Sequence, residues 1–181
     1  MRFAPTDIVE VIVVEPDVLG DARGFFLEVY HRDKYRAGGI DVQFVQENHS
    51  SSRPGTIRGL HCQVQPPQAK LVRVLAGEIF DVAVDIRRGS PSFGRFVSAV
   101  LSSANRRMLF IPAGFAHGFC VTSDVPAEVE YKVTGLYNPS GEITIAWNDP
   151  RIAIPWPTGD PILSAKDHSA PPLQDQLARL P

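Results

Sequence analysis

Residues 55–70 read GTIRGLHCQVQPPQAK, and the rest of the chain can be understood as a scaffold around them. The run combines a histidine, His61, with two cations, Arg58 and Lys70. If residues 57–63 form a strand, successive side chains point to opposite faces. The expected division is Gly59, His61 and Gln63 on one face and Leu60 and Cys62 on the other. One surface of this strand would then present a base, a bare backbone and an amide.

A second histidine, His117, lies in the run IPAGFAHGF. Its Pro-Ala-Gly sequence predicts a turn between an apolar strand that ends at Ile111 and another that begins near Gly118. We expect the fold to bring this turn next to the strand that carries His61.

Short segments with period-two alternation dominate the remainder of the chain. They predict strands at residues 8–15, 25–30, 42–49, 71–76, 78–87, 94–101, 108–111, 118–122, 127–134 and 142–147. Residues 16–24 are predicted to form a loop, and residues 31–37, just before Gly38-Gly39, a short helix. Turns separate many of the strands at short spacing, which favours an all-β sandwich or barrel.

The composition suits one compact domain, residues 1–181, because 44% of the residues are hydrophobic. From about residue 149 the chain is rich in proline, so we expect an extended C-terminal tail with a helical turn near residues 173–180. The formal net charge of -2 and the pI of about 6.2 give no basic field for binding nucleic acid.

The cysteines favour a reduced, cytoplasmic protein. Cys62 and Cys120 show no CxxC spacing, and two cysteines do not make a disulfide framework. The N-terminus reads as a strand and not as a signal peptide. Because no apolar run approaches the roughly 20 residues of a membrane span, we expect no membrane partner.

A β-sandwich with an early histidine and a later Pro-x-Gly-x-x-His turn resembles the cupin double-stranded β-helix, a jelly-roll barrel. The resemblance would imply a metal held by a His-x-His pair, a following carboxylate and the later histidine. Here Gln63 stands two residues after His61, and Lys70 occupies the region of the carboxylate. An ammonium repels a divalent cation, so we expect neither a metal nor another cofactor.

Longer motifs carry a closer resemblance. The runs RGFFLEVY, QENHS, IRGLHCQ, IPAGFAHGF, EYKVTGLYNP, WNDPRIAIPWP and LSAKD follow one another in unbroken order from about Phe3 to Leu173. Together they closely resemble the dTDP-4-dehydrorhamnose 3,5-epimerase family of metal-free cupins. The resemblance implies an isomerase of dTDP-L-rhamnose biosynthesis that converts dTDP-4-keto-6-deoxy-D-glucose into dTDP-4-keto-L-rhamnose.

The resemblance also implies roles for individual residues. His61 would be the base, Asp167 would orient its imidazole, and Lys70 would hold the charge of an enolate. Tyr131 would be the acid that delivers a proton from the opposite face. A second set would bind the substrate: Arg23, Phe26, Glu28, Gln46, Asn48, Arg58, His117, Tyr137, Glu142 and Lys166. Within that set Tyr137 would stack on the thymine ring, since a phenol offers a flat apolar face.

The family further implies a homodimer in which the N-terminal strand and the RGFF segment help to complete the partner's sheet or pocket. The chain itself offers a long, β-branched first strand that would be an exposed edge unless it is covered.

Other functions remain open at this point. Relatives with the same histidine and tyrosine invert only C3 or only C5, so a single-site epimerase of another deoxysugar pathway is the first alternative. A ketoisomerase would not require Tyr131, and a sugar-nucleotide binding protein would be free to lose His61, Lys70 and Tyr131. A metal-dependent dioxygenase would require ligands that the sequence lacks.

Overall fold

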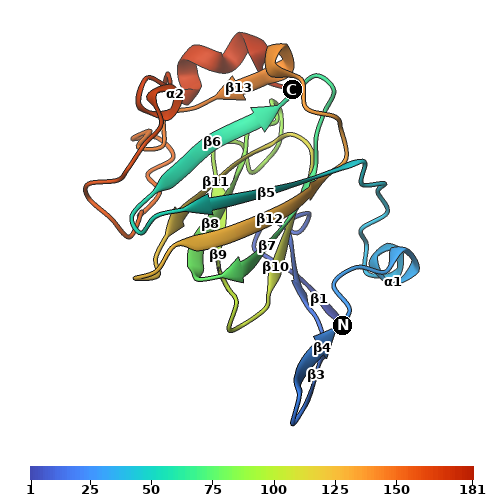
Figure 1. Ribbon diagram of the computed structural model, residues 1–181. Coiled ribbons are helices and arrows are strands. Elements are labelled where there is room, and N and C mark those ends of the chain that lie inside the picture. Colours follow the sequence, from blue (N-terminus) through green and yellow to red (C-terminus); the bar gives the residue numbers. More distant parts are fainter.

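The computed structural model describes residues 1–181 and consists mainly of two antiparallel β-sheets that face each other (Figure 1). The six-stranded sheet contains, in spatial order, β1 (Arg2–Pro5), β2 (Ile12–Glu15), β10 (Met108–Ile111), β7 (Lys70–Ala76), β12 (Ala127–Val133) and β5 (Gln46–Ser52). The five-stranded sheet contains β13 (Glu142–Thr144), β6 (Ile57–Gln63), β11 (Phe115–Val121), β8 (Glu78–Asp85) and β9 (Phe96–Ser102).

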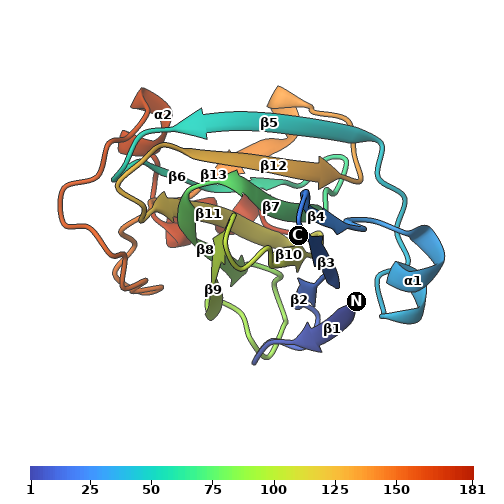
Figure 2. The same ribbon diagram turned by 60° about the horizontal axis from the view of Figure 1, so that its bottom comes forward.

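The order of the strands gives the sandwich its jelly-roll winding. Apart from the step from β8 to β9, every step from β5 to β13 crosses from one sheet to the other. Figure 2 shows β5, β12 and β7 of the six-stranded sheet running side by side. The predicted all-β jelly-roll class is confirmed, and the two walls of the sandwich alternate along the chain.

Short helices and one hairpin surround the sandwich. The helical segments are α1 (Arg32–Ala37), η1 (Pro139–Gly141), α2 (Ala165–His168) and η2 (Leu173–Arg179). A separate hairpin, β3 (Val18–Asp21) with β4 (Gly24–Leu27), extends away from both sheets (Figure 1). No helix has the length and apolar character needed to cross a bilayer.

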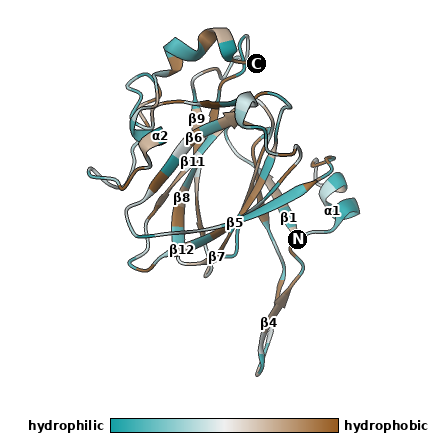
Figure 3. Cartoon of the chain, turned by 45° about the horizontal axis from the view of Figure 1, so that its top comes forward, coloured by the Kyte–Doolittle hydropathy of each residue, from teal (hydrophilic) through white to brown (hydrophobic).

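The strands β8, β10 and β11 are buried along almost their whole length, which explains why they read as continuous apolar runs. Between the sheets lies a cluster that includes Val72, Val129 and Phe115. The outer face of the five-stranded sheet is covered by the C-terminal tail, where Leu173 and Leu180 pack in one cluster with strand residues. Figure 3 shows the hydrophobic segments on β8 and the mostly hydrophilic β5 at the sheet edge.

The prediction for residues 8–15 was partly wrong. Only Ile12–Glu15 is a strand, and the residues before it form a turn in which the Thr6 hydroxyl donates to the Ile8 carbonyl oxygen at 2.9 Å. Ile8 and Val11 are nevertheless buried in the core. The apolar character of residues 8–15 therefore reflects burial in the core and not strand structure.

The predicted loop at residues 16–24 is also wrong, because most of it forms the hairpin β3–β4. The carboxylate of Asp21 accepts a hydrogen bond from the Arg23 backbone N–H at 2.8 Å, and Gly24 has φ +131. An aspartate turn with a glycine at positive φ is a local signal for such a reversal.

Candidate active site

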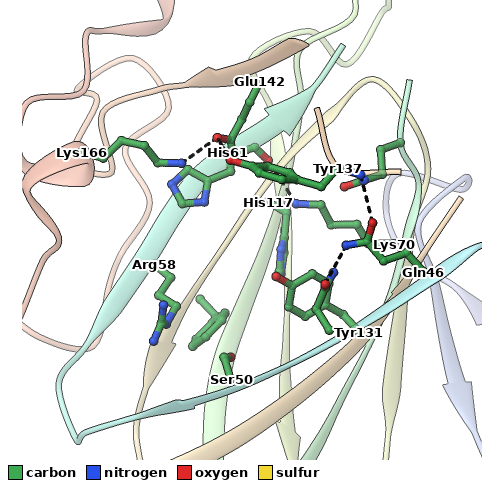
Figure 4. Close-up of a pocket in the computed structure, with 13 residues that line it drawn as sticks. Gln46, Ser50, Arg58, His61, Lys70, His117, Tyr131, Tyr137, Glu142 and Lys166 are labelled. Carbon is green, nitrogen blue, oxygen red and sulfur yellow. Dashed lines mark hydrogen bonds and ion pairs between the residues drawn. The ribbon is translucent and has the colours of Figure 1, made fainter. Parts of the chain in front are cut away.

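One cavity of about 360 Å³ opens between the two sheets. Most of the residues predicted for the site line it: His61, Lys70, Tyr131, Gln46, Asn48, Arg58, His117, Tyr137, Glu142 and Lys166 (Figure 4). Three further lining residues were missed in the sequence: Ser50, Gln68 and Phe119. The volume lies within the range of roughly 300–1,000 Å³ that is typical of small-molecule sites.

The two histidines singled out in the sequence are direct cross-strand neighbours: His117 on β11 lies opposite His61 on β6. His117 lies within a strand that begins at Phe115, so the strand predicted to begin near Gly118 starts earlier. The register shifts just beyond this pair, between His117 and Phe119. A Cβ on Gly59 would come within 2.6 Å of the Gly118 Cα, and Gly59 has φ +129. The glycine before Leu60 thus permits the close approach of the two strands.

Asp167 lies behind His61. Its Oδ1 is 2.6 Å from Nε2 of the imidazole, and the residue is only 3% exposed. Ser164 caps α2 and donates from its hydroxyl to the second carboxylate oxygen, Oδ2, at 2.8 Å. Since the carboxylate holds Nε2, the other ring nitrogen, Nδ1, is left to exchange a proton with a bound molecule.

The environment of Asp167 keeps it ionised. Burial disfavours the charged form, but the hydrogen bonds with His61 and Ser164 outweigh it. The pKa of the Asp167 carboxyl therefore lies below its ordinary value. An ionised carboxylate at this distance stabilises the protonated imidazole that forms when His61 accepts a proton.

His117 has a carboxylate partner of its own, Asp81 on β8, with 2.5 Å between Nε2 and Oδ1. Both side chains are buried. Burial lowers the pKa of His117, and the charge of Asp81 and its hydrogen bond oppose the shift. Sequence reasoning missed Asp81, although an aspartate at an inward position of an apolar strand signals a buried partner.

Lys70, at the start of β7, brings a cation to the centre of the site. Its Nζ is 3.5 Å from the His61 carbonyl oxygen. Burial lowers the pKa of Lys70 from its usual value, and the negative charges of Glu142 and Asp81 oppose the shift. A cation in this partly buried position interacts more strongly than one in bulk water with any negative charge that develops beside it.

Tyr131 faces His61 from the other sheet. It lies on β12 of the six-stranded sheet, whereas His61 lies on β6 of the five-stranded sheet. In the view of Figure 4, Lys70 and His117 stand between the two side chains. Burial raises the pKa of Tyr131 above its ordinary value, so its hydroxyl stays protonated. The cavity therefore has an imidazole on one wall and a phenol hydroxyl on the other.

Comparison with known proteins agrees with this arrangement. The family model described as dTDP-4-dehydrorhamnose 3,5-epimerase matches residues 5–175. The chain belongs to the dTDP-4-dehydrorhamnose 3,5-epimerase family. The predicted family is thus confirmed, and with it the assignment as an epimerase of the isomerase class.

Three relatives of this epimerase family illustrate the similarity. The dTDP-4-dehydrorhamnose 3,5-epimerase of Pseudomonas aeruginosa is 52% identical over 177 residues, 97% of each chain. The crystal structure of dTDP-6-deoxy-D-glucose-3,5-epimerase from Legionella pneumophila, in complex with dTDP-4-keto-L-rhamnose, has a TM-score of 0.95 at 48% identity and covers 99% of this chain and 97% of that one. A dTDP-4-dehydrorhamnose 3-epimerase of Streptomyces niveus is 41% identical over 172 residues, 94% of this chain and 83% of that protein.

Charged and aromatic residues surround the cavity mouth of this 3,5-epimerase family member. Lys166 donates to Oε2 of Glu142 at 2.8 Å, and the Tyr137 hydroxyl lies 3.5 Å from the same oxygen (Figure 4). Arg58 is held by the Ser52 hydroxyl at 2.8 Å. Two cations and an exposed aromatic ring are suited to a phosphorylated ligand with a planar base.

The hairpin residues predicted to bind substrate lie apart from this cavity. Arg23 forms an ion pair with Asp21 at the hairpin tip, and its side chain is 89% exposed. Phe26 is 68% exposed on β4, and Glu28 pairs with Lys34 of α1. Within one copy of the chain, none of these three predicted residues lines the cavity that contains His61.

The site offers no cluster suited to a metal. No group of three or more His, Cys, Asp and Glu side chains lies close enough together to hold an ion.

The side chain of Cys62 packs in the outer cluster with Leu60, on the face opposite to His61, as the alternation predicts.

Proposed function

We propose that the chain inverts C3 and C5 of dTDP-4-keto-6-deoxy-D-glucose and so forms dTDP-4-keto-L-rhamnose, a step of dTDP-L-rhamnose biosynthesis. The observation that carries the proposal is the pairing of the His61–Asp167 dyad on one wall with Tyr131 on the facing wall. Inversion at carbon requires a base on one face and an acid on the other.

The chemistry follows from the C4 ketone, which makes the neighbouring C–H groups acidic. His61 takes the proton from C3, and the electron pair of the broken C–H bond forms an enolate whose charge lies on O4. Lys70 stabilises that charge. The Tyr131 hydroxyl then delivers a proton to the opposite face, which forms the new C–H bond with inverted configuration. His61 then releases its proton to solvent and Tyr131 takes one up, after which the same sequence of steps at C5 completes the reaction.

The mouth of the cavity would hold the nucleotide. Arg58 and Lys166 would bind the diphosphate, since both are cations at the rim. Tyr137 would stack on the thymine ring, because its side chain is 57% exposed at the mouth.

We also propose a homodimer in which the β3–β4 hairpin reaches the site of the partner. The hairpin exposes Leu19, Phe25 and Phe26, which are 66%, 59% and 68% exposed. Apolar side chains of this size on a projecting element favour burial against another protein surface. Arg23, Phe26 and Glu28 would then join the partner's cavity.

A mixing experiment tests this arrangement. Separately purified His61→Ala and Arg23→Ala dimers are each expected to have low activity. If Arg23 acts across the dimer, unfolding and refolding the mixture creates one site with both residues intact, and activity returns. Light scattering that gives a monomer at micromolar concentration, or no regain in the refolded mixture, would contradict the shared site.

A cytoplasmic location belongs to the same proposal. Cys62 and Cys120 are both free and buried in the structure, as suits a protein of a reducing compartment.

The reaction itself is tested with dTDP-4-keto-6-deoxy-D-glucose in deuterated water, by following deuterium at C3 and C5 with NMR and trapping the product with a rhamnose-forming reductase. Deuterium at both carbons and trapped dTDP-L-rhamnose are expected. Deuterium at one carbon only would instead identify a single-site epimerase, the activity that the Streptomyces niveus relative's name carries. No deuterium at either carbon would overturn epimerisation.

A further inference from the structure

The backbone around Tyr137 is fixed by three glutamine side chains. Gln46 comes from β5, Gln63 from β6 and Gln68 from the segment that precedes β7. Their amide groups bind the peptide groups of four consecutive residues: Gly135, Leu136, Tyr137 and Asn138. We call this arrangement the glutamine clamp.

Gln63 makes the largest contribution to the clamp. Its Nε2 donates to the carbonyl oxygens of Leu136 and Pro66, both at 3.0 Å, and its Oε1 accepts from the Asn138 backbone N–H at 2.8 Å. The residue is only 3% exposed. Two carbonyl oxygens face the NH₂ group and one N–H faces the oxygen, so a single orientation of the amide satisfies all partners.

The other two glutamines hold the residues on either side. Gln68 donates from Nε2 to the Gly135 carbonyl oxygen at 2.7 Å. Gln46 accepts from the Tyr137 backbone N–H through Oε1 at 3.0 Å and donates from Nε2 to Asn48 at 2.8 Å (Figure 4). The clamp thus binds donors and acceptors on both sides of Tyr137.

The side chains of this segment contrast with its backbone. Leu136 and Tyr137 are 65% and 57% exposed, so no packing of their own fixes them on the sandwich. Surface segments with exposed side chains are ordinarily mobile, and a binding residue on such a segment loses affinity to the entropy of ordering. The clamp orders the segment in advance, through amides buried beneath it.

We infer that Gln63 is a positioning residue for the nucleotide: through the glutamine clamp it holds Tyr137 in place to stack on a planar base. This inference rests on the proposed role of Tyr137 in the function above. Gln63 itself does not line the cavity, so its effect on binding passes through the segment that it holds.

A double-mutant cycle tests the inference with dTDP as the probe. Gln63→Met removes the three hydrogen bonds at similar side-chain volume. We expect it to weaken dTDP binding about tenfold by titration calorimetry, a change of about 1.4 kcal/mol, while kcat at saturating substrate changes by less than about twofold. In the Tyr137→Ala background, the same substitution should have no further effect on the Kd of dTDP.

Two further variants separate positioning from general stability. Gln176→Met changes a buried glutamine of the C-terminal segment that does not line the cavity, and it should leave the Kd of dTDP unchanged. Gln68→Met removes one hydrogen bond to the segment and should weaken binding less than Gln63→Met does. If Gln63→Met does not fold, as judged by circular dichroism, Gln68→Met replaces it in the double-mutant cycle with Tyr137→Ala.

The outcomes distinguish this inference from the proposed function. Additive effects of Gln63→Met and Tyr137→Ala, or a loss confined to kcat, would overturn the positioning role of Gln63. The proposed function would stand in that case, because the wild type would still bind dTDP and exchange deuterium. An equal weakening by Gln176→Met would overturn it as well. A wild type that neither binds dTDP nor exchanges deuterium would overturn both.

Discussion

Nε2 of His61 and Oδ1 of Asp167 lie 2.6 Å apart although 106 positions separate the two residues along the chain. His61 comes from a strand of the sandwich, and Asp167 comes from a short helix in the C-terminal tail. The dyad therefore exists only when the tail has docked beside β6, close to the end of the molecule that Figure 1 shows around α2 and β13.

Asp167→Asn tests the charge of the dyad. The amide retains the size of the side chain but removes the negative charge that stabilises a protonated His61. We expect kcat for epimerisation to fall roughly 100-fold or more, with an unchanged Kd for dTDP. Steady-state rates and calorimetry measure the two quantities. An unaltered kcat would show that the carboxylate is dispensable.

Tyr131→Phe separates proton removal from inversion. His61 and Lys70 remain, so the C–H bond can still break and the proton can return to the same face. We therefore expect deuterium exchange at C3 with retained configuration, while inverted product falls roughly 100-fold or more. NMR of the recovered nucleotide sugar reports both. Inversion at the wild-type rate would exclude Tyr131 as the acid.

The alkaline limit of activity should belong to Lys70. Burial lowers the pKa of Lys70, so this lysine loses its proton at a lower pH than a lysine in water does. Only the protonated lysine stabilises the enolate, so kcat/KM should fall above the pKa of Lys70. In Lys70→Arg the guanidinium keeps its charge, and the fall should move to higher pH at a lower maximum rate. An unmoved alkaline limb would assign it to another group.

Asp85 should contribute to stability in a pH-dependent way. Its buried carboxylate accepts hydrogen bonds from Arg87, Ser90 and Ser92, which outweigh the effect of burial and lower its pKa. A depressed pKa in the folded state means that this contribution is present above the unfolded value of about 3.9 and is lost as pH falls through the folded value.

Asp85→Ala should lower the free energy of unfolding by about 3 kcal/mol at pH 7, since it removes the hydrogen bonds that Arg87, Ser90 and Ser92 donate to the buried carboxylate. Urea titrations at pH 7 and below pH 4 provide the measurement. The difference between wild type and variant should shrink at the lower pH, and a difference that stays constant would contradict the linkage.

The sequence predicted the parts of the fold that rest on local alternation. Residues 57–63 and 108–111 were predicted with the boundaries that the structure has. Turn chemistry was a weaker guide: residues 16–24 read as a loop because they are rich in turn-forming residues, but residues 18–21 pair with residues 24–27 in a hairpin. The partner of His117 was missed because Asp81 meets it only across the sheet.

The prediction of the site residues depended more on family resemblance than on the pattern of residues along the chain. Nothing local connects Asp167 with His61, because their contact depends on how the tail folds back over the sheet. The glutamines around Tyr137 are equally invisible in the sequence, since their hydrogen bonds go to backbone groups and not to side chains. Long-range contacts of this kind follow from the three-dimensional fold alone.

The C-terminal tail links the completion of the hydrophobic core to the assembly of the candidate active site. Leu173 and Leu180 fasten the tail over the outer face of the five-stranded sheet, and the same tail delivers Asp167 to His61. A ribosome makes this segment after the strands that form both walls of the cavity. The His61–Asp167 contact therefore forms only once the tail has packed on the sheet, so an enzymatic assay would also report whether that packing is complete.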